Sequence, residues 1–134
     1  MNWDINVVAG LVAGVAAMAP GAIIYSPSVL GNVWMKEIKH KPGEGGSPSA
    51  AVAKMFITSL INGLMASLVV WTAGAHTFSE ALRLTMVSVG WFWVSGSLML
   101  VFFENRSWKW FQISALSHVT TAAVIGVVLG LFVK

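Results

Sequence analysis

The chain has 134 residues, of which 57% are hydrophobic and 10% charged, and its formal net charge is +3. Soluble domains average about 45–50% apolar and about 25% charged residues. The composition therefore excludes a soluble globule and a disordered tail, and the absence of cysteine excludes a disulfide scaffold or a cysteine metal site. Four uncharged runs of at least 20 residues remain, at 5–35, 55–79, 84–103 and 110–133. A membrane-spanning helix needs about 20 such residues.

The first run predicts a membrane helix over residues 5–25 that is kinked at Pro20. Proline lacks the backbone N–H of a helical residue and clashes with the preceding turn. A short helix over residues 29–38 is expected to lie in the membrane interface with Trp34 at headgroup level. The glycine- and proline-rich segment that follows predicts a flexible cytoplasmic loop over about 39–50.

The remaining runs predict helices over about 51–73, 82–103 and 107–132. Their connections are short, and short connections make consecutive helices antiparallel neighbours. The sequence therefore predicts an all-α fold, a bundle of four transmembrane helices. We expect one integral membrane domain over residues 1–134.

Lysine and arginine are divided unequally between the two sides of the predicted bundle. The first and third connections carry six of them and the opposite side carries Arg83 and Lys134. By the positive-inside rule these two connections face the cytoplasm and both termini face outside. We expect a multi-pass protein of a bacterial inner membrane, with the lipid bilayer as its partner.

Small residues recur at helical spacing in the first and last predicted helices. The candidate packing residues are Gly10, Gly14, Gly21, Ala122, Gly126 and Gly130. Such rows let helix backbones approach closely inside a membrane. They can pack the first helix on the last within one chain, or they can form the interface of a homo-oligomer or a larger membrane complex.

Uncharged polar residues share one depth in the second, third and fourth predicted helices. At 1.5 Å per residue, Asn62 and His118 lie about 12–13 Å beyond the nearest lysine. The full candidate polar layer is Asn62, Ser95, Ser97, Ser117, His118 and Thr121. These groups can fix the bundle by hydrogen bonds between helices, or they can line a cavity that binds a small solute or relays protons through His118.

Trp91 and Trp93 lie in the middle of the third run and point to nearly opposite faces. They can serve lipid contact and helix packing, or they can stack on a ligand. The three histidines lack metal-ligand spacing, and the sequence contains neither a serine-nucleophile elbow nor a phosphate loop. We therefore expect no enzymatic activity, no metal, no cofactor and no nucleic-acid partner.

Two stretches carry a family resemblance: Gly-Ala-Ile-Ile-Tyr-Ser-Pro at residues 21–27, followed by Leu30-Gly31 and Trp34-Met35-Lys36, and Phe-Glu-Asn-Arg-Ser-Trp-Lys at residues 103–109. Together they resemble the bacterial membrane family catalogued as domain of unknown function 1761. The resemblance covers essentially the whole chain. It implies four membrane helices and brings no established activity.

The two stretches also suggest a structural role at the cytoplasmic face. We expect Tyr25, Ser26 and Pro27 to end the first helix there and to meet Glu104 and Arg106, which would lock that face. The functional expectation from sequence is a non-enzymatic oligomeric or accessory membrane subunit. The alternative is a small-solute or proton transporter or channel that uses the polar layer.

Overall fold

The computed structural model describes residues 4–39 and 48–133, and these residues are helical without strands. The elements in chain order are α1 (Val7–Ala16), α2 (Met18–Ile24), α3 (Gly31–Glu37), α4 (Pro48–Thr72), α5 (Phe78–Thr85), the π-helical turn η1 (Met86–Gly90), α6 (Trp91–Glu104) and α7 (Trp108–Phe132). Four helical stretches are long and apolar enough to cross a membrane: Val7–Ile24, Ser49–Thr72, Phe78–Glu104 and Trp108–Phe132. The four predicted spans are thus confirmed.

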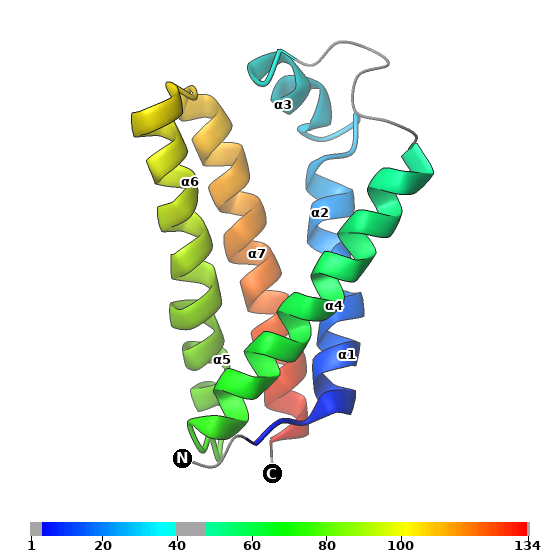
Figure 1. Ribbon diagram of the computed structural model, residues 1–134, viewed down its shortest axis with the longest axis vertical. Helices are drawn as coiled ribbons and strands as arrows, with labels where there is room; N and C mark the ends of the chain where they lie inside the picture. Colours follow the sequence, from blue (N-terminus) through cyan, green and yellow to red (C-terminus); the bar gives the residue numbers. More distant parts are fainter. Residues whose placement is uncertain (1–3, 40–47, 134) are drawn as a thin grey trace.

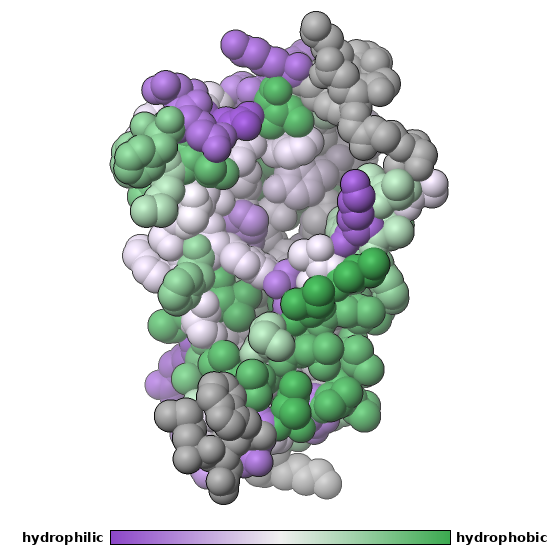
Figure 2. Space-filling model, in the orientation of Figure 1, coloured by the Kyte–Doolittle hydropathy of each residue, from purple (hydrophilic) through white to green (hydrophobic). Residues whose placement is uncertain are grey.

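The two chain ends lie together at one end of the bundle, which we call the terminal end (Figure 1). The opposite end carries α3 and the turn between α6 and α7, and we call it the basic end. Large apolar side chains such as Val8, Phe92, Phe103 and Leu131 are exposed on the outer surface. Figure 2 shows apolar residues over much of α4 and hydrophilic residues toward both ends. This distribution suits a bundle surrounded by lipid.

The last span, α7, is the central helix of the bundle. It packs against α1, α2, α5 and α6, while α4 packs chiefly against α1 and meets the third span at α5 and η1. The core combines alanines of the first span, α4 and α5 with larger side chains of α4 and α7. Its members are Ala9, Ala13, Ala17, Ala66, Val70, Ala81, Ile125 and Leu129. In Figure 1, α4 diverges from α6 and α7 toward the basic end.

Glycine brings α1 and α4 into backbone contact near the terminal end. A Cβ atom on Gly63 would lie 2.5 Å from the backbone nitrogen of Gly14. A Cβ atom on Gly14 would lie 2.7 Å from the carbonyl oxygen of Ser59. The Ser67 hydroxyl, which is fully buried, also donates to the carbonyl oxygen of Asn6 at 2.8 Å. Gly10 and Gly14 therefore pack on α4, while the first span also packs on the last helix, α7, as the first alternative has it.

The glycine row of α7 packs on the start of the third span. A Cβ atom on Gly126 would approach Leu82 and Thr85, and one on Gly130 would approach the ring of Phe78. Ala122 belongs to the same row and faces Gly90, the last residue of η1, whose own Cβ would lie 3.2 Å from that of Ala122. Both small-residue rows are thus in contact with other helices of the same chain.

The third span begins earlier than the predicted residue 82. Thr77 is the N-cap of α5, and Thr77 and Glu80 form a complete capping box. The Thr77 hydroxyl accepts from the Glu80 N–H, and the Glu80 carboxylate accepts from the N–H groups of His76 and Thr77. The capping box therefore makes Phe78 the first helical residue.

The first span is interrupted at Ala17, between α1 and α2. Pro20 has no N–H to offer to the carbonyl of Ala16, so the break falls where the proline removes a helical hydrogen bond. The bend of the axis at this point stays a prediction. The predicted loop over 39–50 extends too far toward the C-terminus, because α4 already begins at Pro48. Residues 40–47 of that loop lie outside the described residues.

We predict that Gly63→Ala destabilises the protein by about 1–3 kcal/mol, because the added methyl forces the α1 and α4 backbones apart. The measurement is the thermal unfolding midpoint of the purified protein in mild detergent. Gly96→Ala is the matched control, since a Cβ atom there meets nothing within 4 Å. Equal midpoints for the two variants would contradict the close packing of α1 on α4.

Candidate functional site

A cavity of about 330 Å³ lies between α2, α4, α6 and α7. It lies where α4 has diverged from α7, and Figure 2 shows the surface hollowed in the upper half of the view. Its lining residues are Ala17, Met18, Gly21, Tyr25, Met55, Thr58, Ser59, Asn62, Trp93, Ser117, His118 and Thr121. The described lining thus contains no Asp, Glu, Lys or Arg side chain.

Four residues of the predicted polar layer converge on this cavity: Asn62 from α4, and Ser117, His118 and Thr121 from α7. A fifth member, Ser97 of α6, is buried, and its hydroxyl oxygen lies 3.0 Å from Nε2 of His118. These residues therefore bring α4, α6 and α7 together around one cavity.

Ser95 is the member of the predicted layer that the structure separates from the others. Its hydroxyl donates to the carbonyl of Phe92 at 3.0 Å, within its own helix. A serine that bonds its own backbone in this way needs no partner on another helix. Ser95 and Ser97 are two residues apart, so they point to different sides of α6.

The His118 ring is held from two sides. Ser97 bonds Nε2, and the ring of Trp93 lies 5.6 Å away, centroid to centroid, at a tilt of 52°. Nδ1 has no hydrogen-bond partner among the residues that the structure describes. Trp93 thus contributes to the cavity wall, whereas Trp91 is 68% exposed on the outer surface. The two tryptophans divide between cavity and lipid-facing positions.

Several lining residues were missed from the sequence. Thr58 and Ser59 lie one turn from Asn62 on α4, and Gly21 and Tyr25 lie one turn apart around the end of α2. The spacing of Thr58 and Asn62 by four residues is a signal that the sequence carries, since such residues share a helix face. A Cβ atom on Gly21 would have nothing within 4 Å, so this glycine faces the open cavity rather than another helix.

The predicted contact between residues 25–27 and the Glu104–Arg106 pair takes a different form. Tyr25 packs edge-on against Trp34 of α3 at 5.1 Å between ring centroids, and Asn32 donates to the carbonyl of Pro27. The Ser26 hydroxyl donates to the carbonyl of Ile23. These contacts join the end of the first span to α3 rather than to Glu104.

The link to the α6–α7 turn passes through α3. Ser107 donates from its hydroxyl to the carboxylate of Glu37 and accepts from the N–H of Trp110, so it is the N-cap of α7 as well. Arg106 pairs with Glu104 at 3.3 Å, and its guanidinium carbon lies 5.8 Å from the centre of the Trp110 ring. The Glu37–Ser107 bond, which the sequence did not predict, thus joins α3 to the start of α7.

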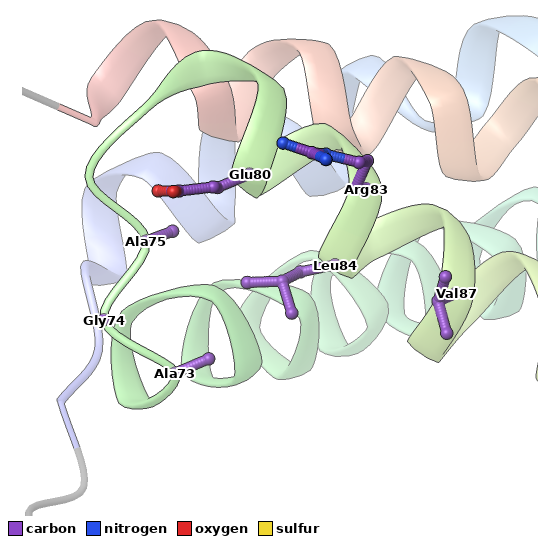
Figure 3. A pocket seen from close by; sticks show the side chains of 7 residues that line it. All are labelled: Ala73, Gly74, Ala75, Glu80, Arg83, Leu84 and Val87. Atoms are coloured by element: carbon purple, nitrogen blue, oxygen red, sulfur yellow. The ribbon is translucent and has the colours of Figure 1, made fainter.

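A second cavity, of about 470 Å³, lies at the terminal end between the α4–α5 connection, α5 and η1 (Figure 3). Its charged residues, Glu80 and Arg83, extend from neighbouring turns of α5. Both charged groups are used within the helix start: Glu80 accepts from backbone N–H groups, and Arg83 Nε donates to the carbonyl of Ser79. This cavity therefore gathers fewer uncommitted polar groups than the one around His118.

The described ranges contain no group of three His, Asp or Glu side chains that could hold a metal ion. Fold and composition define the class: an all-helical protein with four helices long and apolar enough to cross a membrane. The chain belongs to the family described as protein of unknown function (DUF1761), whose model matches residues 8–130. This confirms the family resemblance. No curated protein and no solved structure gives a match.

We predict that Glu37 and Ser107 are energetically coupled. In a double-mutant cycle with Glu37→Ala and Ser107→Ala, the coupling energy should be about 0.5–3 kcal/mol, because the two side chains are in contact. The measurement is unfolding of the detergent-solubilised protein. A cycle between Glu37→Ala and Glu80→Ala is the control, since Glu80 caps α5 at the opposite end of the bundle and distant sites are additive. Coupling near zero in the first cycle would show that the bond does not hold α3.

Proposed function

We propose that this chain is a non-enzymatic membrane protein that binds a small, uncharged polar solute in the His118 cavity, as a transporter or channel. The observation that carries the proposal is the convergence of Asn62, His118 and Thr121 on one cavity within the membrane-spanning helices. His118 is ten residues from the start of α7, about 15 Å along a helix that must cross about 30 Å of hydrocarbon.

The lining determines the class of solute. An amide, an imidazole and hydroxyl groups can each donate or accept hydrogen bonds, and Trp93 and Tyr25 add aromatic surface. Charged side chains are missing from the described lining, so an ion would lose its hydration without gaining a countercharge. A neutral solute with several hydrogen-bonding groups and an apolar face suits this lining best.

A proton relay is less well supported than solute binding. Proton pathways in membranes use chains of Asp, Glu and His residues. In the described cavity lining, His118 is the single titratable residue of these types. Its Nε2 is hydrogen-bonded to Ser97, and no Asp, Glu or second His in the described lining continues a relay.

The oligomeric or accessory subunit expected from the sequence stays a prediction. The glycine rows that suggested it are in contact with α4 and α5 of the same chain. Each row thus has a partner inside the chain that accounts for its small residues. They no longer argue for an interface between chains.

We also propose that the basic end faces the cytoplasm of a bacterial inner membrane. Among the described residues, Lys36, Lys39, Lys54, Arg106 and Lys109 belong to the basic end, and Arg83 lies near the terminal end. The positive-inside rule then places both termini outside.

Reconstituted liposomes test the transport proposal, with glycerol and urea as neutral probes and stopped-flow light scattering as the measurement. Wild-type protein should accelerate solute entry over protein-free liposomes. His118→Ala should lower the rate of solute entry through the protein about tenfold, because it leaves Ser97 and the solute without a hydrogen-bond partner. Ser95→Ala is the matched control, since Ser95 bonds only the backbone of its own helix.

Unchanged entry rates in the His118→Ala liposomes would remove that residue from the mechanism. If liposomes with wild-type protein took up both glycerol and urea no faster than protein-free liposomes, transport of this solute class would be contradicted.

A further inference from the structure

A second polar cleft lies at the basic end, apart from the His118 cavity. It has a volume of about 340 Å³ and is bounded by the end of α3 and the turn between α6 and α7. Three cationic side chains line it: Lys36 and Lys39 from α3 and its C-terminal turn, and Arg106 from the α6–α7 turn. Residues distant in sequence thus bring positive charge to one cleft.

The two carboxylates of this cleft are already engaged. Glu37 accepts from the Ser107 hydroxyl, and Glu104 accepts from Arg106 at 3.3 Å. Lys36 and Lys39 have no ion-pair partner among the described residues and are exposed. The cleft therefore offers two uncommitted ammonium groups beside a guanidinium that the Glu104 pair and Trp110 hold in place.

The backbone fixes both walls of the cleft. Lys39 and Asn105 have φ angles of 52° and 53° and are the positive-φ residues other than glycine in the described chain. Each follows the end of a helix, and each lines this cleft. Helices commonly end with a residue in the left-handed conformation, so these two residues turn the chain at the two walls of the cleft.

Aromatic residues place the cleft at the level of lipid headgroups. Trp108 packs edge-on against Phe102 at 6.2 Å and against Phe111 at 5.8 Å between ring centroids. Trp108 directly follows the cleft residue Ser107 and is 58% exposed. Exposed tryptophans at helix ends are typical of the membrane–water interface.

We propose that this cleft binds a phosphate group, with Lys36, Lys39 and Arg106 as the cationic ligands. The headgroup of an anionic phospholipid and a free phosphate share this chemistry. Lysine and arginine supply several N–H donors to phosphate oxygens. The site is independent of the solute proposed for the His118 cavity.

The test compares two double variants with the same loss of charge at the same end of the bundle. Lys36→Gln with Lys39→Gln removes the cleft ammonium groups. Lys54→Gln with Lys109→Gln removes two exposed lysines that do not line the cleft. Native mass spectrometry of the full chain from mild detergent, with added phosphatidylglycerol or phosphatidylcholine, reads the bound lipid, and a thermal-shift titration with inorganic phosphate at matched ionic strength reads the free anion.

Wild-type protein should bind phosphatidylglycerol in preference to phosphatidylcholine, and the cleft variant should bind it roughly 5- to 30-fold more weakly, as expected for two lysines near anionic lipid. The control variant should lose less affinity than the cleft variant, because Lys54 and Lys109 do not line the cleft. Stabilisation by inorganic phosphate that is lost only in the cleft variant would instead identify free phosphate as the source. Equal losses in both double variants, or no preference of the wild type for either anion, would overturn the site. The double variant Lys36→Arg with Lys39→Arg keeps the charge and should bind phosphatidylglycerol as wild type does. It shows whether substitution at these two positions by itself disturbs the fold.

Discussion

The backbone contact between α1 and α4 is the constraint on which the rest of the structure depends. Gly10, Gly14 and Gly63 carry no side chains of their own, so the backbones of the two helices touch. This contact holds α4 against α1 rather than along α7. In Figure 1, α4 diverges from α6 and α7 toward the basic end, and the cavity around His118 lies between α2, α4, α6 and α7.

The same arrangement explains where polar groups are tolerated. Inside a membrane, each buried polar group needs a partner from the protein or from a water-filled cavity. Ser67 finds its partner in the backbone of Asn6, and Ser97 finds it in His118. Asn62 and Thr121 instead face the cavity. The cavity is thus the place in the described spans where side chains with hydrogen-bonding capacity gather without being used up by packing.

The basic end is held by contacts of a different kind. Tyr25 and Trp34 join the first span to α3 through their rings, and Glu37 joins α3 to the cap of α7. These contacts lie at an end of the bundle where aromatic rings and charged groups gather, which is typical of the membrane–water interface. As a result, α3 stands over the diverging helices rather than packing along them.

The sequence predicted the four spans because apolar runs and the length of a membrane helix leave little choice. It also grouped Asn62, Ser97 and His118 by the rise per residue, and the structure places Asn62 and His118 on one cavity with Ser97 in contact with His118. Rotation about each helix axis does not follow from these quantities. The sequence therefore could not separate Ser95 from Ser97, or assign Gly14 to α4 rather than to α7.

The start of the third span was misplaced for a local reason. Glu80 and Arg83 separate two apolar runs, and the predicted helix begins at residue 82, between these two charges. The capping box at Thr77 begins the helix at Phe78, four residues before residue 82, and the charged side chains lie within the first turns of α5. The Glu37–Ser107 bond joins residues 70 positions apart and depends on how α3 docks, which no local pattern encodes.

The most direct test of a hydrated cavity between the spans is the accessibility of single cysteines to a polar, membrane-impermeant maleimide. The chain contains no cysteine, so each introduced thiol is the only reactive one. Thr121 lines the cavity, whereas Val119, on the same helix, is 41% exposed on the apolar surface. We predict that Thr121→Cys in liposomes is labelled and that Val119→Cys, covered by lipid, is not. Equal protection of both thiols would contradict a hydrated polar cavity between α4 and α7.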